Sequence, residues 1–116
     1  MARGEGAPAP PSSGTTGAVL HCLGQVYLRQ GQPHRAAVLL MVAAREAPGS
    51  APVLRALAAA LIACGLGRPA VDALSGAEAL DPEGAAHPMG RLLRARALLA
   101  DGRRSEARLV FRGDGR

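Results

Sequence analysis

Residues 23–37 read LGQVYLRQGQPHRAA, and residues 57–71 read LAAALIACGLGRPAV. The two stretches lie 34 residues apart and share one skeleton of small, apolar and turn residues. The paired positions are Leu23 with Leu57, Gly24 with Ala58, Gly31 with Gly65, Ala36 with Ala70, Leu40 with Leu74, Ala43 with Ala77, and Pro48 with Pro82. Internal repetition at this period predicts stacked helix-turn-helix units, each of which needs its neighbours to bury its apolar face.

The repeated residues have distinct physical roles. A small residue such as Gly24 lets the two helices of one unit approach closely, while Gly31 and Gly65 end the first helix of their units. Pro48 and Pro82 cannot continue a helix, so they mark where one unit passes to the next. This pattern resembles the tetratricopeptide repeat. It predicts an all-α array of about three hairpins that winds into a right-handed superhelix.

The chain has 116 residues, which is enough for one domain with a modest core. Residues 1–16 contain three Gly, three Pro and four Ser or Thr, and we expect them to form a disordered tail. The repeat domain is expected over residues 17–116, with units at 17–50 and 51–84 and an incomplete unit at 88–116. The helices are predicted over residues 18–30, 33–47, 52–64, 68–79, 88–101 and 104–112.

The third unit departs from the pattern of the first two. It follows three extra residues, and Arg94 stands where the other units have Leu23 and Leu57. After Phe111 the pattern contains no additional polar helix of the kind that covers the last unit of many arrays. Leu109 and Phe111 are therefore expected to lack a full cover, which a partner chain or a second copy of the protein could supply.

Two longer segments resemble a known family. Residues 20–40 read LHCLGQVYLRQGQPHRAAVLL, and residues 102–108 read GRRSEAR. The first segment is a hydrophobic hairpin with a Gln-Gly turn that opens the repeat region, and the second closes it. In these two features the short chain is similar to the small type III secretion chaperones of the YscY (SctY) family. The likeness covers residues 18–112. It implies a cytoplasmic bacterial chaperone that keeps a small X-type export substrate soluble and brings it to the export gate at the inner membrane.

Other functions remain open on the sequence. A translocator-class type III secretion chaperone shares the repeat, although such chains usually run longer and bind extended segments. A generic tetratricopeptide adaptor shares most of the same motifs. An RNA-binding helical array is a third alternative, in which the basic last helix would contact the RNA.

The first helix of each hairpin lines the concave side of such arrays, so the partner-binding wall is predicted there. Its residues are His21, Gln25, Leu28 and Arg29 in the first unit, Arg55, Ala59, Ile62 and Ala63 in the second, and Met89, Leu92, Arg96 and Leu99 in the third. The apolar members are expected to be exposed in a row and to bind an amphipathic helix of a partner protein. Arg29, Arg55 and Arg96 would select acidic flanks. The alternative is that some of these side chains pack between neighbouring helices as core.

The positive charge lies at one end of the chain. Residues 91–116 hold eight arginines and three acidic residues, which accounts for the whole net charge of +5. Arg104, Arg108 and Arg112 recur every four residues and should form one stripe on the last helix. Because Phe111 is the only aromatic residue beside it, the stripe favours a solvated face or an acidic protein partner over nucleic acid.

The sequence gives no sign of catalysis, cofactors or metal binding. Cys22 and Cys64 fall in different hairpins and are expected to be reduced, and the three histidines lack metal-ligand spacing. Residues 65–70 match a dinucleotide-binding pattern, but they follow a helical run and coincide with the repeat's own turn. Neither a signal peptide nor an apolar run long enough for a membrane span is evident, since the longest runs, such as residues 56–64, have nine residues. A cytoplasmic location is therefore expected.

Overall fold

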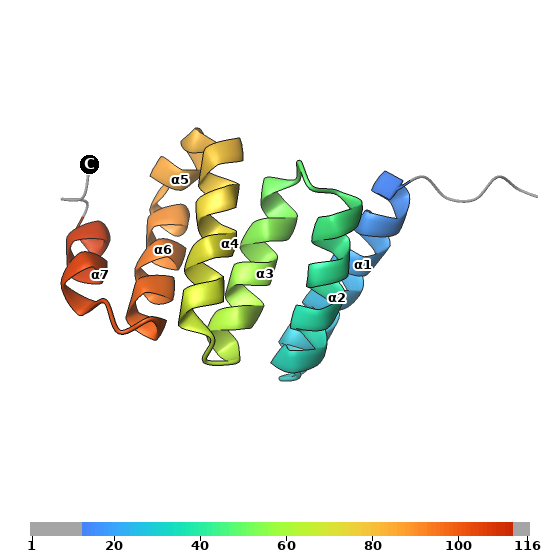
Figure 1. The fold of residues 1–116 in the computed structure, drawn as a ribbon, viewed down its shortest axis with the longest axis horizontal. Helices are drawn as coiled ribbons and strands as arrows, with labels where there is room; N and C mark the ends of the chain where they lie inside the picture. The colour runs from blue at the N-terminus through green and yellow to red at the C-terminus, as the bar shows by residue number, and fades with distance from the viewer. Residues whose placement is uncertain (1–12, 113–116) are drawn as a thin grey trace, which may run out of the picture.

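The computed structural model describes residues 13–112, and all regular secondary structure in that range is helical (Figure 1). The helices are α1 (Ser13–Arg29), α2 (Pro33–Glu46), α3 (Ala51–Ala63), α4 (Gly67–Leu80), α5 (Pro82–Ala86), α6 (Pro88–Ala100) and α7 (Arg104–Phe111). Three hairpins, α1 with α2, α3 with α4, and α6 with α7, follow one another in a row. The prediction of an all-α helical repeat is confirmed.

The start of α1 differs from the predicted boundary of the tail. Residues 13–16 form the first turn of α1, so the helix begins five residues before the predicted start at residue 18. The remainder of the predicted tail, residues 1–12, lies outside the described residues.

Each hairpin turns at a glycine in the left-handed region. Gly31, Gly65 and Gly102 have φ angles of 74°, 77° and 78°. In the first turn the Gly31 N–H donates to the Leu28 carbonyl, and the next N–H donates to the Tyr27 carbonyl; both bonds recur at the other two turns. This is the Schellman end of a helix, and glycine adopts its backbone conformation without strain. The predicted helix ends at Gly31 and Gly65 are therefore confirmed.

Small residues set the distance between the two helices of a hairpin. A Cβ atom added at Gly24 of α1 would lie 2.6 Å from Cγ of Leu40 in α2, and Leu40 is fully buried. In the second helix of each hairpin, Ala36, Ala70 and Ala107 are likewise buried. The helices pack closely because these positions carry little or no side chain.

The hairpins stack into two layers with one continuous core. The first helices contact each other in order, α1 with α3 and α3 with α6, while each second helix also packs on the next hairpin, α2 on α3 and α4 on α6. The largest fully buried side chains are Leu40, Leu74 and Leu98, one in each hairpin. They belong to a single cluster that extends from α2 to α7.

The junction between the second and third units contains a short helix that the sequence pattern did not predict. Gly65 and Gly102 lie 37 residues apart, against 34 for Gly31 and Gly65, and α5 spans the end of the second unit and part of this three-residue insertion. The Asp81 carboxylate caps α5 by accepting from the Gly84 N–H at 3.0 Å. His87 ends the insertion and caps α6, because its Nδ1 accepts from the Met89 N–H at 3.1 Å.

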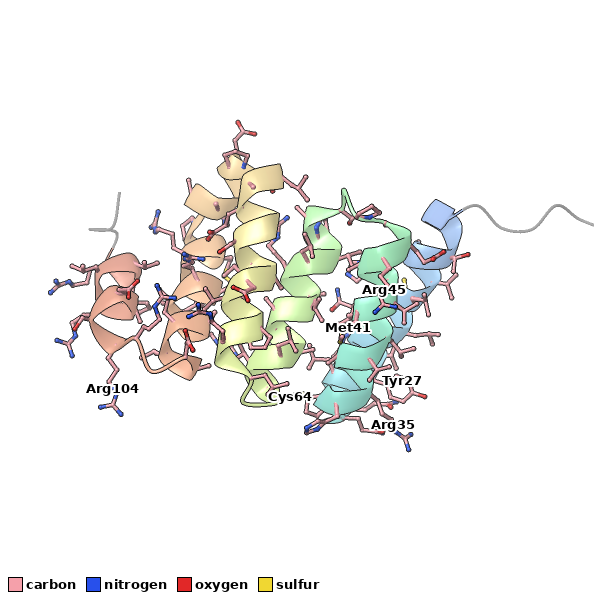
Figure 2. The ribbon with its side chains drawn as sticks, viewed as in Figure 1. Tyr27, Arg35, Met41, Arg45, Cys64 and Arg104 are labelled. Atoms are coloured by element: carbon pink, nitrogen blue, oxygen red, sulfur yellow. The ribbon has the colours of Figure 1, made fainter. Side chains whose placement is uncertain are left out.

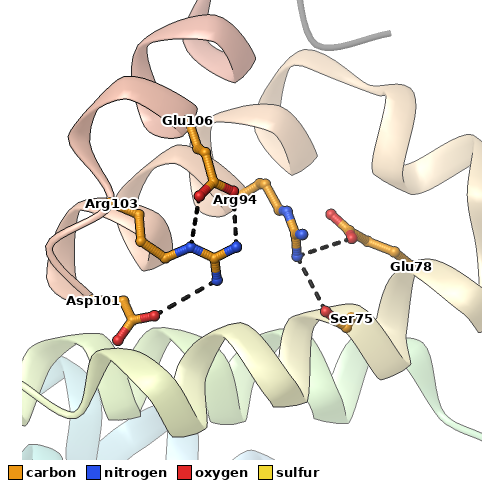
Figure 3. Close-up of polar contacts among 6 residues, drawn as sticks. All are labelled: Ser75, Glu78, Arg94, Asp101, Arg103 and Glu106. Carbon is orange, nitrogen blue, oxygen red and sulfur yellow. Dashed lines mark hydrogen bonds and ion pairs between the residues drawn. The ribbon is translucent and has the colours of Figure 1, made fainter.

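Arg94 replaces the expected leucine with a polar link between α4 and α6 (Figure 3). Its Nη1 donates to Ser75 Oγ at 3.2 Å and pairs with Glu78 Oε1 at 3.2 Å. Burial raises the pKa of Glu78, and the nearby Arg94 charge acts in the opposite direction. The departure from the repeat pattern at Arg94 thus coincides with polar partners on α4.

Candidate partner-binding site

An open hollow of about 360 Å³ lies where α3, the α5 insertion and α6 meet. It is lined by Arg55, Gly84, His87, Met89, Gly90, Leu92, Leu93 and Arg96. Four of these, Arg55, Met89, Leu92 and Arg96, belong to the predicted wall. The structure therefore brings the second-unit arginine and most of the third-unit residues together around one concavity.

Two glycines allow the walls of the hollow to approach each other. A Cβ atom at Gly90 would overlap the carbonyl oxygen of Gly84, so the start of α6 lies directly against α5. A Cβ atom at Gly84 would overlap the Asp81 carboxylate and come within 3.0 Å of Arg55 Nη1. These contacts fix the position of α5, and with it one edge of the hollow.

The arginines that line the hollow differ in their partners. Arg55 Nη1 pairs with Asp81 Oδ2 at 3.2 Å, so an internal carboxylate already compensates its charge. Arg96 is exposed and forms no ion pair with any described residue. Near the hollow, Arg91 donates from Nη1 to the Ala86 carbonyl at 2.8 Å. Of the predicted charge-selecting residues at this site, Arg96 is the one available to an acidic partner.

Beside His87 and the two glycines, apolar side chains form the rest of the wall. Met89 is 66% exposed, while Leu92 and Leu93 are half-buried and Leu93 packs against the core. An exposed methionine beside half-buried leucines is a deformable apolar surface, because the unbranched thioether adapts to different shapes. The hollow combines this surface with the Arg96 charge at its edge.

The predicted exposed row of apolar residues is not continuous. Leu28 and Ile62 are half-buried and pack against the core, because the first helices of successive hairpins contact each other. Leu99 occupies the equivalent position in the third unit and is exposed, since no further hairpin follows it within the described residues. The alternative of core packing is therefore correct for Leu28 and Ile62. Ala59, also on α3, is half-buried.

The predicted residues of the first unit do not line the hollow. His21 and Gln25 lie one turn apart on α1, and their Nε2 atoms form a hydrogen bond at 3.1 Å. Arg29 is exposed at the end of the same helix. Helix α1 contacts α3, whereas the hollow is formed by residues of α3, α5, α6 and the His87 junction.

The lining residues that sequence reasoning missed are Gly84, His87, Gly90 and Leu93. Three of them lie at or beside the insertion. The departure from the 34-residue period was the one sequence signal that could have pointed to this region. The period marks where an insertion lies, but it does not give the conformation of the inserted residues.

The basic stripe begins on α7, where Arg104 and Arg108 are exposed and Arg104 extends away from the helix (Figure 2). The neighbouring Arg103 is instead engaged at the turn between α6 and α7. It donates to both Glu106 carboxylate oxygens and pairs with Asp101 Oδ2 at 3.6 Å (Figure 3). The hydrogen bond from Arg103 lowers the pKa of Glu106.

The comparisons with known proteins give no family for this chain. No protein-family model matches it, and no curated protein is significantly similar to it. Within residues 13–112, no three His, Cys, Asp or Glu side chains gather as a metal site would require. None of the helices described is both long enough and apolar enough to cross a membrane. Cys22 and Cys64 are free thiols, and burial raises the pKa of Cys64.

Proposed function

We propose that the protein is a binding module that holds an amphipathic helix of a partner protein over the hollow between α3, α5 and α6. The observation that carries this proposal is the exposed Met89 surface beside Arg96, which has no ion pair among the described residues. Burial of apolar surface provides affinity, and an unpaired cation at its edge favours an acidic residue of the partner.

The size of the hollow limits how the partner binds. A volume of about 360 Å³ admits a few side chains and is too small for a whole helix. The partner helix therefore lies across the opening and inserts apolar anchors against Met89 and Leu92. An acidic residue about one turn from those anchors would reach Arg96.

The resemblance to the YscY (SctY) family suggests a more specific role. On that basis the partner is a small X-type export substrate of type III secretion, which the protein keeps soluble in the cytoplasm and delivers to the export gate. A generic adaptor would use the same hollow for a different partner. This specific role rests on the sequence resemblance, whereas the binding mode rests on the hollow.

Co-expression of the full chain with a small X-type export protein, followed by affinity purification, tests both parts. Met89→Asp should reduce the recovered partner about tenfold or more, because it places a carboxylate in an apolar contact. Arg96→Glu should weaken binding severalfold, with a smaller effect at high salt. Leu66→Asp is the matched control, since Leu66 is exposed at the start of α4, where an Asp N-cap is tolerated.

The outcomes separate the two parts of the proposal. If the wild-type chain fails to bind the X-type protein, the chaperone assignment is wrong. If it binds and Met89→Asp behaves like Leu66→Asp, the hollow is not the binding site.

A further inference from the structure

Helix α1 exposes an apolar face that the hollow does not use. Val19, Leu23 and Val26 are 53%, 44% and 42% exposed and lie on one side of the helix. The equivalent positions in the second unit are buried: Val53 at 3%, Leu57 at 7% and Ala60 at 0%. We call Val19, Leu23 and Val26 the α1 face.

The repeat shows what kind of element fits the α1 face. Where the first two units meet, α2 packs against α3, and the residues of α3 equivalent to the α1 face are buried in this stack. No helix occupies that place beside α1 among the described residues. The α1 face is thus a helix-stacking surface without its covering helix.

The absence of charge on the α1 face determines which surface can cover this face. Arg29, the last residue of α1, is the only charged residue of the helix, so the α1 face carries no charge. A charged covering surface would lose its hydration there and find no partner. The covering helix must therefore also present an uncharged apolar side.

The opposite end of the array does not meet this requirement. There Leu99 and Phe111 are exposed together with the cationic side chains of Arg104 and Arg108. Arg108 stands at the position that Ala37 and Val71 hold in the other units, where both are buried inside the stack. Head-to-tail stacking of two copies would press these arginines against the uncharged α1 face.

We propose that two copies of the chain associate through the α1 face, with α1 of one copy packed antiparallel against α1 of the other about a two-fold axis. Each uncharged face then meets an identical uncharged face, as a two-fold contact requires. Cys22 is exposed and lies midway along the face between Val19 and Val26. The axis passes near this residue, so the two Cys22 thiols come close together. The hollow lies on other helices, and each copy keeps its own hollow open.

The mass of the full chain in solution, measured over roughly a hundredfold dilution, tests the proposal. A dimer that dissociates on dilution is expected. Leu23→Asp should raise the dimer dissociation constant about a hundredfold, because it buries a carboxylate at the centre of the contact. Val38→Asp is the control: Val38 is exposed on α2 and is not part of the α1 face, so its substitution should leave the dimer intact.

Oxidative cross-linking gives a second readout that does not depend on a destabilising variant. Mild oxidation should link the wild-type dimer, Cys22→Ser should abolish the link, and Cys64→Ser should retain it. If Leu23→Asp loses its helical circular dichroism, Val19→Glu at the edge of the face replaces it. A chain that is monomeric at every concentration overturns the proposal. A dimer that dissociates in the Phe111→Asp variant but persists in the Leu23→Asp variant also overturns the proposal.

Discussion

Single residues decide where the hairpins turn and how closely the helices pack. Gly31, Gly65 and Gly102 each hold a left-handed backbone at the end of a first helix, and Gly24 gives Leu40 the space it fills. The sequence repeat identified these positions because each needs a residue type that few others can replace. The same reasoning misjudged Leu28, whose exposure depends on the neighbouring hairpin and not on its own residue type.

Substitution of Gly102 should reveal the strain that glycine avoids. Gly102→Ala places a side chain at φ 78° and should lower the free energy of unfolding by about 1 kcal/mol. Gly49→Ala is the control, because Gly49 also has open space around it but no left-handed backbone. Urea unfolding of both variants checks this, and equal stabilities would contradict it.

The pair formed by Arg94 and Glu78 makes stability depend on pH. Because burial raises the pKa of Glu78 above its ordinary value of 4.5, the folded chain binds this proton more tightly than the unfolded chain. This residue's contribution to the free energy of unfolding therefore falls as the pH rises through the window just above 4.5.

Removal of Arg94 should enlarge that effect. Arg94→Leu leaves Glu78 without its cation, so its pKa should rise further and the variant should lose about 1 kcal/mol at pH ~7. The loss should shrink toward pH ~5, where Glu78 is more often protonated. Chemical denaturation at both pH values measures it. The double variant with Glu78→Gln should recover part of the loss, and a deficit independent of pH would exclude this role for Glu78.

At the scale of elements, periodic and inserted segments differ in how well they can be predicted. The five helices from α2 to α7 that belong to hairpins begin and end within a residue of their predicted bounds, because caps, glycines and prolines mark both ends. Helix α5 and half of the residues that line the hollow were not predicted. An insertion has no counterpart in the other units, so the repeat carries no information about its conformation.

The contact between α5 and α6 gives a prediction for the hollow. Gly90→Ala should lower stability by about 1–3 kcal/mol, because the new methyl group overlaps the Gly84 carbonyl and must displace α5. Binding of the proposed partner should weaken with it. Gly76→Ala is the control, since its Cβ would make an ordinary 3.4 Å contact with Leu54. Thermal unfolding that does not distinguish the two variants would show that α5 moves freely.

At the scale of the whole molecule, the hairpins share one core, and this predicts cooperative unfolding. Leu74→Ala should cost about 2–5 kcal/mol, because it opens a cavity in the middle hairpin. Tyr27 is the only tyrosine and the chain has no tryptophan, so its fluorescence reports on the first hairpin alone. The Tyr27 transition and the far-ultraviolet circular dichroism transition should shift together. Leu80→Ala, at an exposed leucine, should shift neither by much.

Separate transitions for the two probes would contradict this expectation. The first hairpin would then unfold independently of the second, as the nearest-neighbour stability of repeat proteins permits when the interface between units is weak. The ends of the array also differ in charge, with the uncharged α1 face at one end and exposed arginines on α7 at the other. This difference disfavours open-ended head-to-tail assembly.

The junction that contains α5 is only slightly longer than the junction between the first two units. Between the second and third turn glycines the chain gained only three residues relative to its own period, yet this gain supplies one wall of the hollow. A junction longer by three residues thus accommodates a concavity while the buried leucines of every unit keep their places. Deletion of residues 85–87 would restore the 34-residue period.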